Sequence, residues 1–179
     1  MCGDCIKKTP FYQSINAMYL YEGALMKAVH RLKYGAKSYL ADSLGPLLAR
    51  FAETCLVNTE GLLTIPVPLH PKKLRERGFN QSLLLARHVA LHLGTELDFL
   101  SLRRVKYRLP QAGLGKEARR KNVFGAFRME NQDALKGKSV LLVDDVATTG
   151  STLNECARVL VQAGYEKVDC LVLARTGTF

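Results

Sequence analysis

No run of the sequence approaches the roughly 18 consecutive apolar residues that a membrane-spanning helix requires. The first residues, MCGDCIKK, also lack the apolar stretch of a secretory signal peptide. Neither an internal repeat nor a low-complexity tract interrupts the chain. We therefore expect a cytoplasmic protein that does not insert into a membrane, with most of its 179 residues in one domain.

Acidic residues are scarce relative to basic ones. The chain has 16 Asp and Glu against 26 Lys and Arg, a formal net charge of +10. Its surface should therefore attract anions, a class that includes phosphates, pyrophosphate and nucleic acid. Charge alone does not distinguish among these partners.

Cysteines are few and odd in number, which argues against a framework of disulfides in a chain that we expect to be cytoplasmic. Cys156 shares a helical face with apolar neighbours and Cys170 alternates with valines, so both are predicted to be core residues; Cys55 closes an apolar helix. Only Cys2 and Cys5, spaced C-x-x-C, have the pattern of metal or redox ligands. Two free thiols are the alternative.

Apolar periodicity predicts alternating strands and helices. Strands are expected at 17–21, 62–68, 97–102, 139–144 and 168–174, and helices at 23–34, 40–54, 80–93 and 152–163. Residues 69–79 are predicted to form a polar loop, and residues 103–122 a basic, mobile loop. Because buried strands alternate with helices, we expect an α/β fold with a parallel sheet and ligands at the carboxyl ends of its strands.

The segment VLLVDDVATTGST at 140–152 carries the clearest functional pattern. Its apolar residues predict a strand buried on both faces, followed by two acids, a turn of small residues and a helix. Backbone N–H groups at the start of a helix can bind a phosphate, and a glycine permits its close approach. The predicted phosphate-binding residues are Ala147, Thr148, Thr149, Gly150, Ser151 and Thr152.

A phosphate in this turn places a ribose beside Asp144 and Asp145, whose oxygens can accept hydrogen bonds from the sugar hydroxyls. Their negative charge favours a cationic transition state at C1′, which makes both acids candidate catalytic residues. They are also candidates for orienting Mg²⁺, directly or through its water shell. The pattern resembles the signature of type I phosphoribosyltransferases, which bind phosphoribosyl pyrophosphate (PRPP). The alternative is a buried strand that merely ends in acids.

A second segment, IPVPLHPKKLRERGFNQ at 65–81, has the same order of strand, loop and helix with a more basic loop. In the phosphoribosyltransferase fold the loop after the equivalent strand receives pyrophosphate, which concentrated positive charge suits. The resemblance therefore implies pyrophosphate binding by Leu69, His70, Lys72, Lys73, Arg75 and Arg77. A solvated basic loop, with the histidine at its surface, is the alternative.

The basic stretch at 103–122 has two candidate partners. Three of its residues could close over PRPP as a lid that excludes water from a reactive cation: Arg119, Arg120 and Asn122. A solvated basic turn is the alternative for these. Together with Tyr107 for stacking, four other residues are candidate contacts to single-stranded nucleic acid: Arg103, Arg104, Lys106 and Arg108.

The two motifs PVPLHPKKLRERGFNQ and LLVDDVATTGSTL together resemble the ComF family, also called ComFC or GntX-like. The likeness extends to HRLKYGAK at 30–37 and QAGLGKEARRKNVFGAF at 111–127, so it covers nearly the whole chain. It implies a type I phosphoribosyltransferase fold, with helices on both faces of a parallel sheet, and a Mg²⁺–PRPP site. Such proteins are associated with DNA uptake in natural transformation in some bacteria.

The resemblance implies transfer of the phosphoribosyl group to a nitrogen nucleophile with release of pyrophosphate. The alternative is an accessory of DNA uptake, with PRPP as a ligand and single-stranded DNA and competence proteins as partners. Family members usually carry two C-x-x-C pairs in an N-terminal zinc ribbon, whereas only Cys2 and Cys5 are present here. We therefore interpret residues 1–10 as a remnant of this segment with half a zinc site, and residues 11–179 as the phosphoribosyltransferase-like domain.

Overall fold

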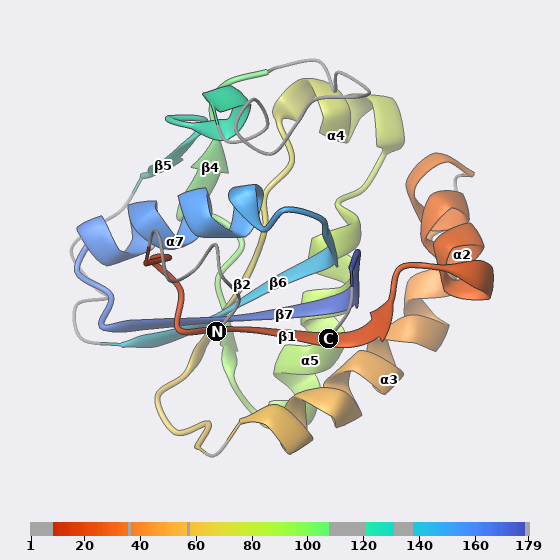
Figure 1. Cartoon of the computed structure of the whole chain (residues 1–179), viewed down its shortest axis with the longest axis horizontal. Coiled ribbons are helices and arrows are strands. Elements are labelled where there is room, and N and C mark those ends of the chain that lie inside the picture. The colour runs from red at the N-terminus through yellow and green to blue at the C-terminus, as the bar shows by residue number, and fades with distance from the viewer. Residues whose placement is uncertain (1–8, 36, 57, 108–120, 131–137, 178–179) are drawn as a thin grey trace.

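The computed structural model describes residues 9–35, 37–56, 58–107, 121–130 and 138–177 (Figure 1). Several of the predicted site residues lie outside these ranges: Cys2, Cys5, Arg108, Arg119 and Arg120.

Five parallel strands form the main sheet, in the order β1-β7-β6-β2-β3. These strands are β1 (Ser14–Leu20), β2 (Leu63–Pro66), β3 (Glu96–Leu97), β6 (Ser139–Ala147) and β7 (Lys167–Arg175). The helices are α2 (Gly23–Tyr34), α3 (Leu40–Cys55), α4 (Pro71–Arg77), α5 (Gln81–Leu93) and α7 (Ser151–Gln162). The expected α/β fold with a parallel sheet is confirmed.

Helices cover both faces of this sheet. Successive side chains of a strand point to opposite sides, so the apolar strands contribute to a packed cluster on each face. Leu141 and Leu171 pack into a cluster with apolar residues of α2, α3 and α5. Val140 and Cys170 pack on the other face, in a cluster that includes residues of α7. Figure 1 shows α3 and α5 on one side of the strands and α7 on the other. Cys156 and Cys170 are fully buried, as the sequence predicted.

The prediction of one strand at 97–102 is wrong, because these residues belong to two different sheets. Glu96–Leu97 is the edge strand β3, whereas Leu102–Arg104 forms β4 and pairs antiparallel with β5 (Phe127–Met129). Between them the side chain of Asp98 accepts hydrogen bonds from the backbone N–H groups of Leu100 and Ser101, which turns the chain. Strand β5 was not expected, since three residues carry little periodicity.

The prediction of a polar loop at 69–79 is wrong over most of that range, because residues 71–77 form the helix α4. Pro71 occupies its first turn and His70 caps it, accepting from the N–H of Lys72 at 3.2 Å. Gly78 ends it with a left-handed φ of 82°. No residue of α4 is buried, so the segment carries no apolar stripe by which it could be predicted.

The prediction of a loop at 103–122 is also wrong in part. Arg103 and Arg104 belong to strand β4, and residues 121–123 are helical. Strand β6 is longer than expected and includes both acids before it ends at Ala147.

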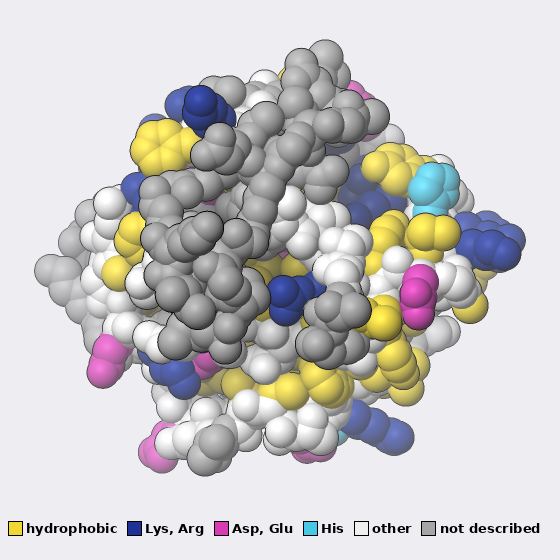
Figure 2. Space-filling model, viewed as in Figure 1, with side chains coloured by type: hydrophobic (Ala, Val, Ile, Leu, Met, Phe, Trp, Pro, Cys, Tyr) yellow, Lys and Arg dark blue, Asp and Glu magenta, His cyan; other side chains and the backbone are white. Residues whose placement is uncertain are grey.

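None of the helices in the described ranges combines the length and apolar character needed to cross a bilayer. On the face shown in Figure 2, the Lys and Arg side chains that are coloured lie at several separate places rather than in one patch.

Candidate functional site

A cavity of about 250 Å³ opens beyond the carboxyl ends of β2 and β6. Parallel strands in an α/β sheet commonly place a ligand there. The predicted site residues that line it are Leu69, His70, Lys73, Arg77, Arg104, Asp144, Asp145 and Thr152. The structure adds residues for which the sequence suggested no role: Lys33, Tyr34, Gln81 and Ser82.

Asp144 and Asp145 lie in the last part of β6 and are only 8% and 2% exposed. One oxygen of Asp144 accepts hydrogen bonds from the hydroxyl of Ser82 at 2.7 Å and from the N–H of Asp145 at 2.9 Å. The Oδ1 of Asp145 accepts from the N–H of Val146 at 2.7 Å. Both carboxylates are therefore held in place before any ligand binds.

Lys33, at the end of α2, supplies the positive charge for this pair. Its Nζ lies 2.8 Å from Oδ2 of Asp145, and its side chain is 21% exposed. Burial by itself lowers the pKa of Lys33, but the carboxylates of Asp145 and Asp144 outweigh burial and raise this pKa above its ordinary value. Lys33 thus stays charged beside the acids.

Two adjacent buried carboxylates cannot both ionise freely. Burial, followed by the charge of Asp145, raises the pKa of Asp144 to about 7. The charge of Lys33 and the hydrogen bond from Ser82 act in the opposite direction. Near neutral pH, Asp144 can therefore either accept a hydrogen bond as a carboxylate or donate one as an acid.

The predicted phosphate turn joins β6 to α7. Gly150 precedes the helix with a left-handed φ of 70°, and no side chain caps the helix at this residue. The hydroxyls of Thr149 and Ser151 are 2.8 Å apart. Thr152, in the first turn of α7, lines the cavity, whereas Ala147 is buried at the end of β6. The N–H of Ser151 donates to Oγ1 of Thr149 at 3.4 Å. The next N–H groups at the start of α7 can be presented to an anion.

The basic residues of α4 and its cap divide into two groups. His70, Lys73 and Arg77 line the cavity, whereas Lys72 and Arg75 are exposed and do not line it. Lys73 pairs with Glu76 at 2.7 Å.

Tyr107, which also lines the cavity, lies beside the start of α4. Its ring is 5.2 Å from that of His70, and the Nζ of Lys72 is 4.7 Å from its centre. The aromatic residue predicted to stack on nucleic acid thus contacts the residues predicted to bind pyrophosphate.

The two arginines of β4 have different surroundings because they alternate along a strand. Arg103 is 45% exposed and lies 3.4 Å from Glu130. Arg104 lines the cavity, and its buried Nε has no hydrogen-bond partner among the described residues. Burial lowers the pKa of Arg104, although the charge of Asp144 partly opposes this effect. Arg104 therefore contributes a poorly solvated cation to the site.

Of the remaining predicted residues, Lys106 is exposed and Asn122 is half-buried in the helical residues 121–123. Neither residue lines the cavity. In the described part of the chain, no group of three or more His, Cys, Asp and Glu side chains could hold a metal ion.

Residues 80–178 match the family model of the phosphoribosyl transferase domain. DNA utilization protein YhgH of Salmonella typhi is 35% identical over 180 residues, which cover 98% of this chain and 78% of that protein. Competence protein F of Haemophilus influenzae is 32% identical over 178 residues, which cover 97% of this chain and 78% of that protein. The chain belongs to the ComF family. A more distant relative is competence protein ComFC of Bacillus subtilis, 26% identical over 92% of this chain and 67% of that protein.

Solved structures with a similar fold include the glutamine PRPP amidotransferase of B. subtilis, 20% identical, with a TM-score of 0.47 over 74% of this chain and 25% of that chain. Another is the purine phosphoribosyltransferase of Pyrococcus horikoshii, 19% identical, with a TM-score of 0.45 over 78% of this chain and 77% of that chain. In this ComF-family chain, the family match and the five-stranded parallel sheet confirm the expected type I phosphoribosyltransferase fold. The matched residues include both acids and the turn before α7, whereas Lys33 and α4 precede the match.

Proposed function

We propose that this ComF-family protein binds Mg²⁺–PRPP in the cavity beyond β2 and β6 and transfers the phosphoribosyl group to a nitrogen nucleophile. The observation that supports this most is the arrangement of charge in one cavity. The buried acids Asp144 and Asp145 lie there together with Thr152 of the α7 start, and the cations Lys73 and Arg104 line the same cavity. A sugar with a phosphate at one end and a pyrophosphate at the other matches that arrangement.

In the proposed complex the 5′-phosphate binds at the turn of residues 148–152 and the ribose hydroxyls contact Asp144 and Asp145. The pyrophosphate lies toward His70 and Lys73. Arg104, whose Nε has no partner in the described part of the chain, supplies a further donor to it. The nitrogen lone pair attacks C1′ as the bond between C1′ and the pyrophosphate oxygen breaks. The bonding electrons leave with the pyrophosphate, and the nitrogen gives up one proton.

The two acids suit a hydrated Mg²⁺ better than one stripped of its water. Oδ1 of Asp144 is engaged by Ser82 and Oδ2 of Asp145 by Lys33, so direct coordination at either oxygen would compete with an existing contact. Mg²⁺ gives up water reluctantly and commonly keeps several water ligands. When bound, the ion would supply positive charge to the departing pyrophosphate.

Calorimetry with Mg²⁺–PRPP tests the proposal. The double variant Asp144→Asn with Asp145→Asn should lose PRPP binding, because the amides carry no negative charge for the sugar and the metal. Asp42→Asn is the control, since this acid is 76% exposed on α3. Thermal unfolding checks that each variant is folded. Undiminished affinity in the folded double variant would place the ligand elsewhere.

Binding of single-stranded nucleic acid is a second candidate function. It is favoured by the net charge of +10 and by relatives named for DNA utilization and competence. Competence proteins would be partners in that case. For either function, we propose that the protein is located in the cytoplasm.

A further inference from the structure

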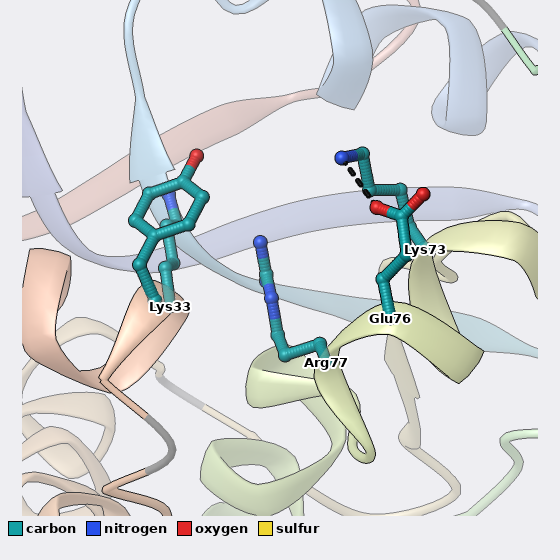
Figure 3. A pocket seen from close by; sticks show the side chains of 5 residues that line it. Lys33, Lys73, Glu76 and Arg77 are labelled. Atoms are coloured by element: carbon teal, nitrogen blue, oxygen red, sulfur yellow. Dashed lines mark hydrogen bonds and ion pairs between the residues drawn. The ribbon is translucent and has the colours of Figure 1, made fainter.

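A second, smaller cavity of about 180 Å³ lies between α2 and α4. Its lining residues are Lys33, Tyr34, Lys73, Glu76 and Arg77 (Figure 3). All of these except Glu76 also line the main cavity, so the two adjoin each other. We call the smaller one the side cavity. A group bound in it would lie next to the proposed ribose site, because Lys33 contacts Asp145.

Arg77 is oriented from two directions in the side cavity. Its guanidinium donates a hydrogen bond to Oε1 of Gln81, a residue only 4% exposed. It also lies 5.5 Å from the ring centre of Tyr34, across the gap between the helices. Figure 3 shows the side chain reaching from α4 toward α2. A guanidinium held in one orientation loses little freedom when it binds an anion.

The charge of Arg77 is not neutralised as those of its neighbours are. Lys33 pairs with Asp145, and Lys73 pairs with Glu76. No carboxylate of the described residues lies within ion-pair distance of Arg77, whose hydrogen-bond partner is a neutral amide. Among the described residues that line the side cavity, Arg77 is therefore the cation that is free to bind an external acid.

We propose that the side cavity binds the acidic group, a carboxylate or a phosphate, of the acceptor amine. This inference rests on the proposed phosphoribosyl transfer. A small molecule whose acid binds Arg77 has its remaining atoms directed along Lys33 toward Asp145, where the ribose is proposed to lie. The acceptor is then an amine that carries an acidic group, rather than ammonia or an uncharged base.

Pyrophosphate is the competing occupant of the side cavity, since the sequence placed Arg77 with the pyrophosphate residues. Two features favour the acceptor. His70 and Arg104 line the main cavity but not the side cavity, so an imidazole and a guanidinium are available to pyrophosphate there without Arg77. The guanidinium lies 5.5 Å from the ring centre of Tyr34, so it reaches toward α2 (Figure 3).

Ligand-observed NMR tests the inference with three amines: glycine, aminomethylphosphonate and ethylamine. Mg²⁺, pyrophosphate and ribose 5-phosphate are present in excess, because together they fill the main cavity and offer no bond to break. Glycine or aminomethylphosphonate should bind, and ethylamine, which lacks an acid, should not. Binding of one acid and not the other identifies the source of the acidic group.

Arg77→Gln and Tyr34→Leu should each weaken the acidic amine at least tenfold and pyrophosphate by a much smaller factor, although both residues also line the main cavity. Arg87→Gln, an exposed arginine on α5, is the matched control and should change neither affinity. Full retention of amine binding in both folded variants, or binding of none of the acidic amines by the wild type, would overturn the inference. So would a tenfold loss of pyrophosphate affinity in Arg77→Gln. A wild-type protein that binds the amine but not PRPP would refute the proposed function alone.

Discussion

At the scale of single residues, the site depends on how buried charge is balanced. Asp144 has a pKa of about 7 because burial and Asp145 both disfavour its ionised form. Its ordinary value is 3.8. The folded protein thus binds a proton at Asp144 more tightly than the unfolded chain does. The resulting stability is fully present below pH 3.8 and is lost as pH rises through about 7.

We expect Asp144→Asn to remove this pH dependence. Asparagine is uncharged at every pH and keeps an oxygen that can accept from Ser82. Relative to the variant, the wild type should gain roughly 2 kcal/mol in free energy of unfolding between pH 8 and pH 5.5. Urea denaturation of both proteins at the two pH values measures the difference, and titrating groups that do not interact with Asp144 cancel in the comparison. A constant difference would show that Asp144 is ionised throughout this range.

At the scale of helices and strands, the site is assembled where short segments change direction. The end of β6 carries the acids, and the start of α7 carries the phosphate turn. Gly150 permits this turn, because few other residues adopt its φ of 70°. A Cβ added there would lie 3.3 Å from Ile15 and 3.4 Å from the hydroxyl of Tyr12.

Gly150→Val should lower PRPP affinity at least tenfold, because a β-branched side chain strains the turn and obstructs the phosphate. Gly94→Val is the matched control. Gly94 ends α5 with a φ of 65°, and an added Cβ would meet nothing within 4 Å. Both variants should lose stability, about 1 kcal/mol or more, but only the first should lose ligand. Calorimetry and urea denaturation measure the two effects. Equal PRPP affinity in both folded variants would contradict the phosphate-turn assignment.

At the scale of the whole molecule, the excess of basic residues has more than one use. Arg103 and Lys106 are exposed, whereas Arg104 points into the cavity. A cluster that is continuous in sequence is thus divided between the surface and the proposed PRPP site. The two groups should respond differently to nucleic acid and to PRPP.

If the exposed residues contact single-stranded DNA, replacing Arg103 and Lys106 by Gln should flatten the slope of log affinity against log salt by about 1.4, since each phosphate contact contributes about 0.7. PRPP affinity should be unchanged. Arg104→Gln should do the reverse, weakening PRPP and leaving the slope unchanged. Titration of a labelled oligonucleotide and of PRPP across a salt series measures both. An unaltered slope in the double variant would exclude these two residues as DNA contacts.

The sequence alone determined the strand, acid pair, turn and helix at 140–152, and with them the fold class and the family. These features are local: contiguous residues form them, and apolar spacing and turn chemistry reveal them. Short elements lack such local patterns, so they were not predicted. Helix α4 and strand β5 are too short to show a period, and Asp98 ended the expected strand by a side-chain contact.

Only the tertiary structure decided which distant residues complete the site. Ser82 bonds to Asp144 across 62 positions of the chain, and Lys33 reaches Asp145 from a helix that precedes the whole family match. Arg104 and its neighbour Arg103 read alike in sequence, yet the alternation of one strand gives them different surroundings. These contacts depend on how the chain returns to the carboxyl ends of β2 and β6. The chain returns there because apolar faces of elements far apart in the sequence pack together. No local pattern specifies that packing.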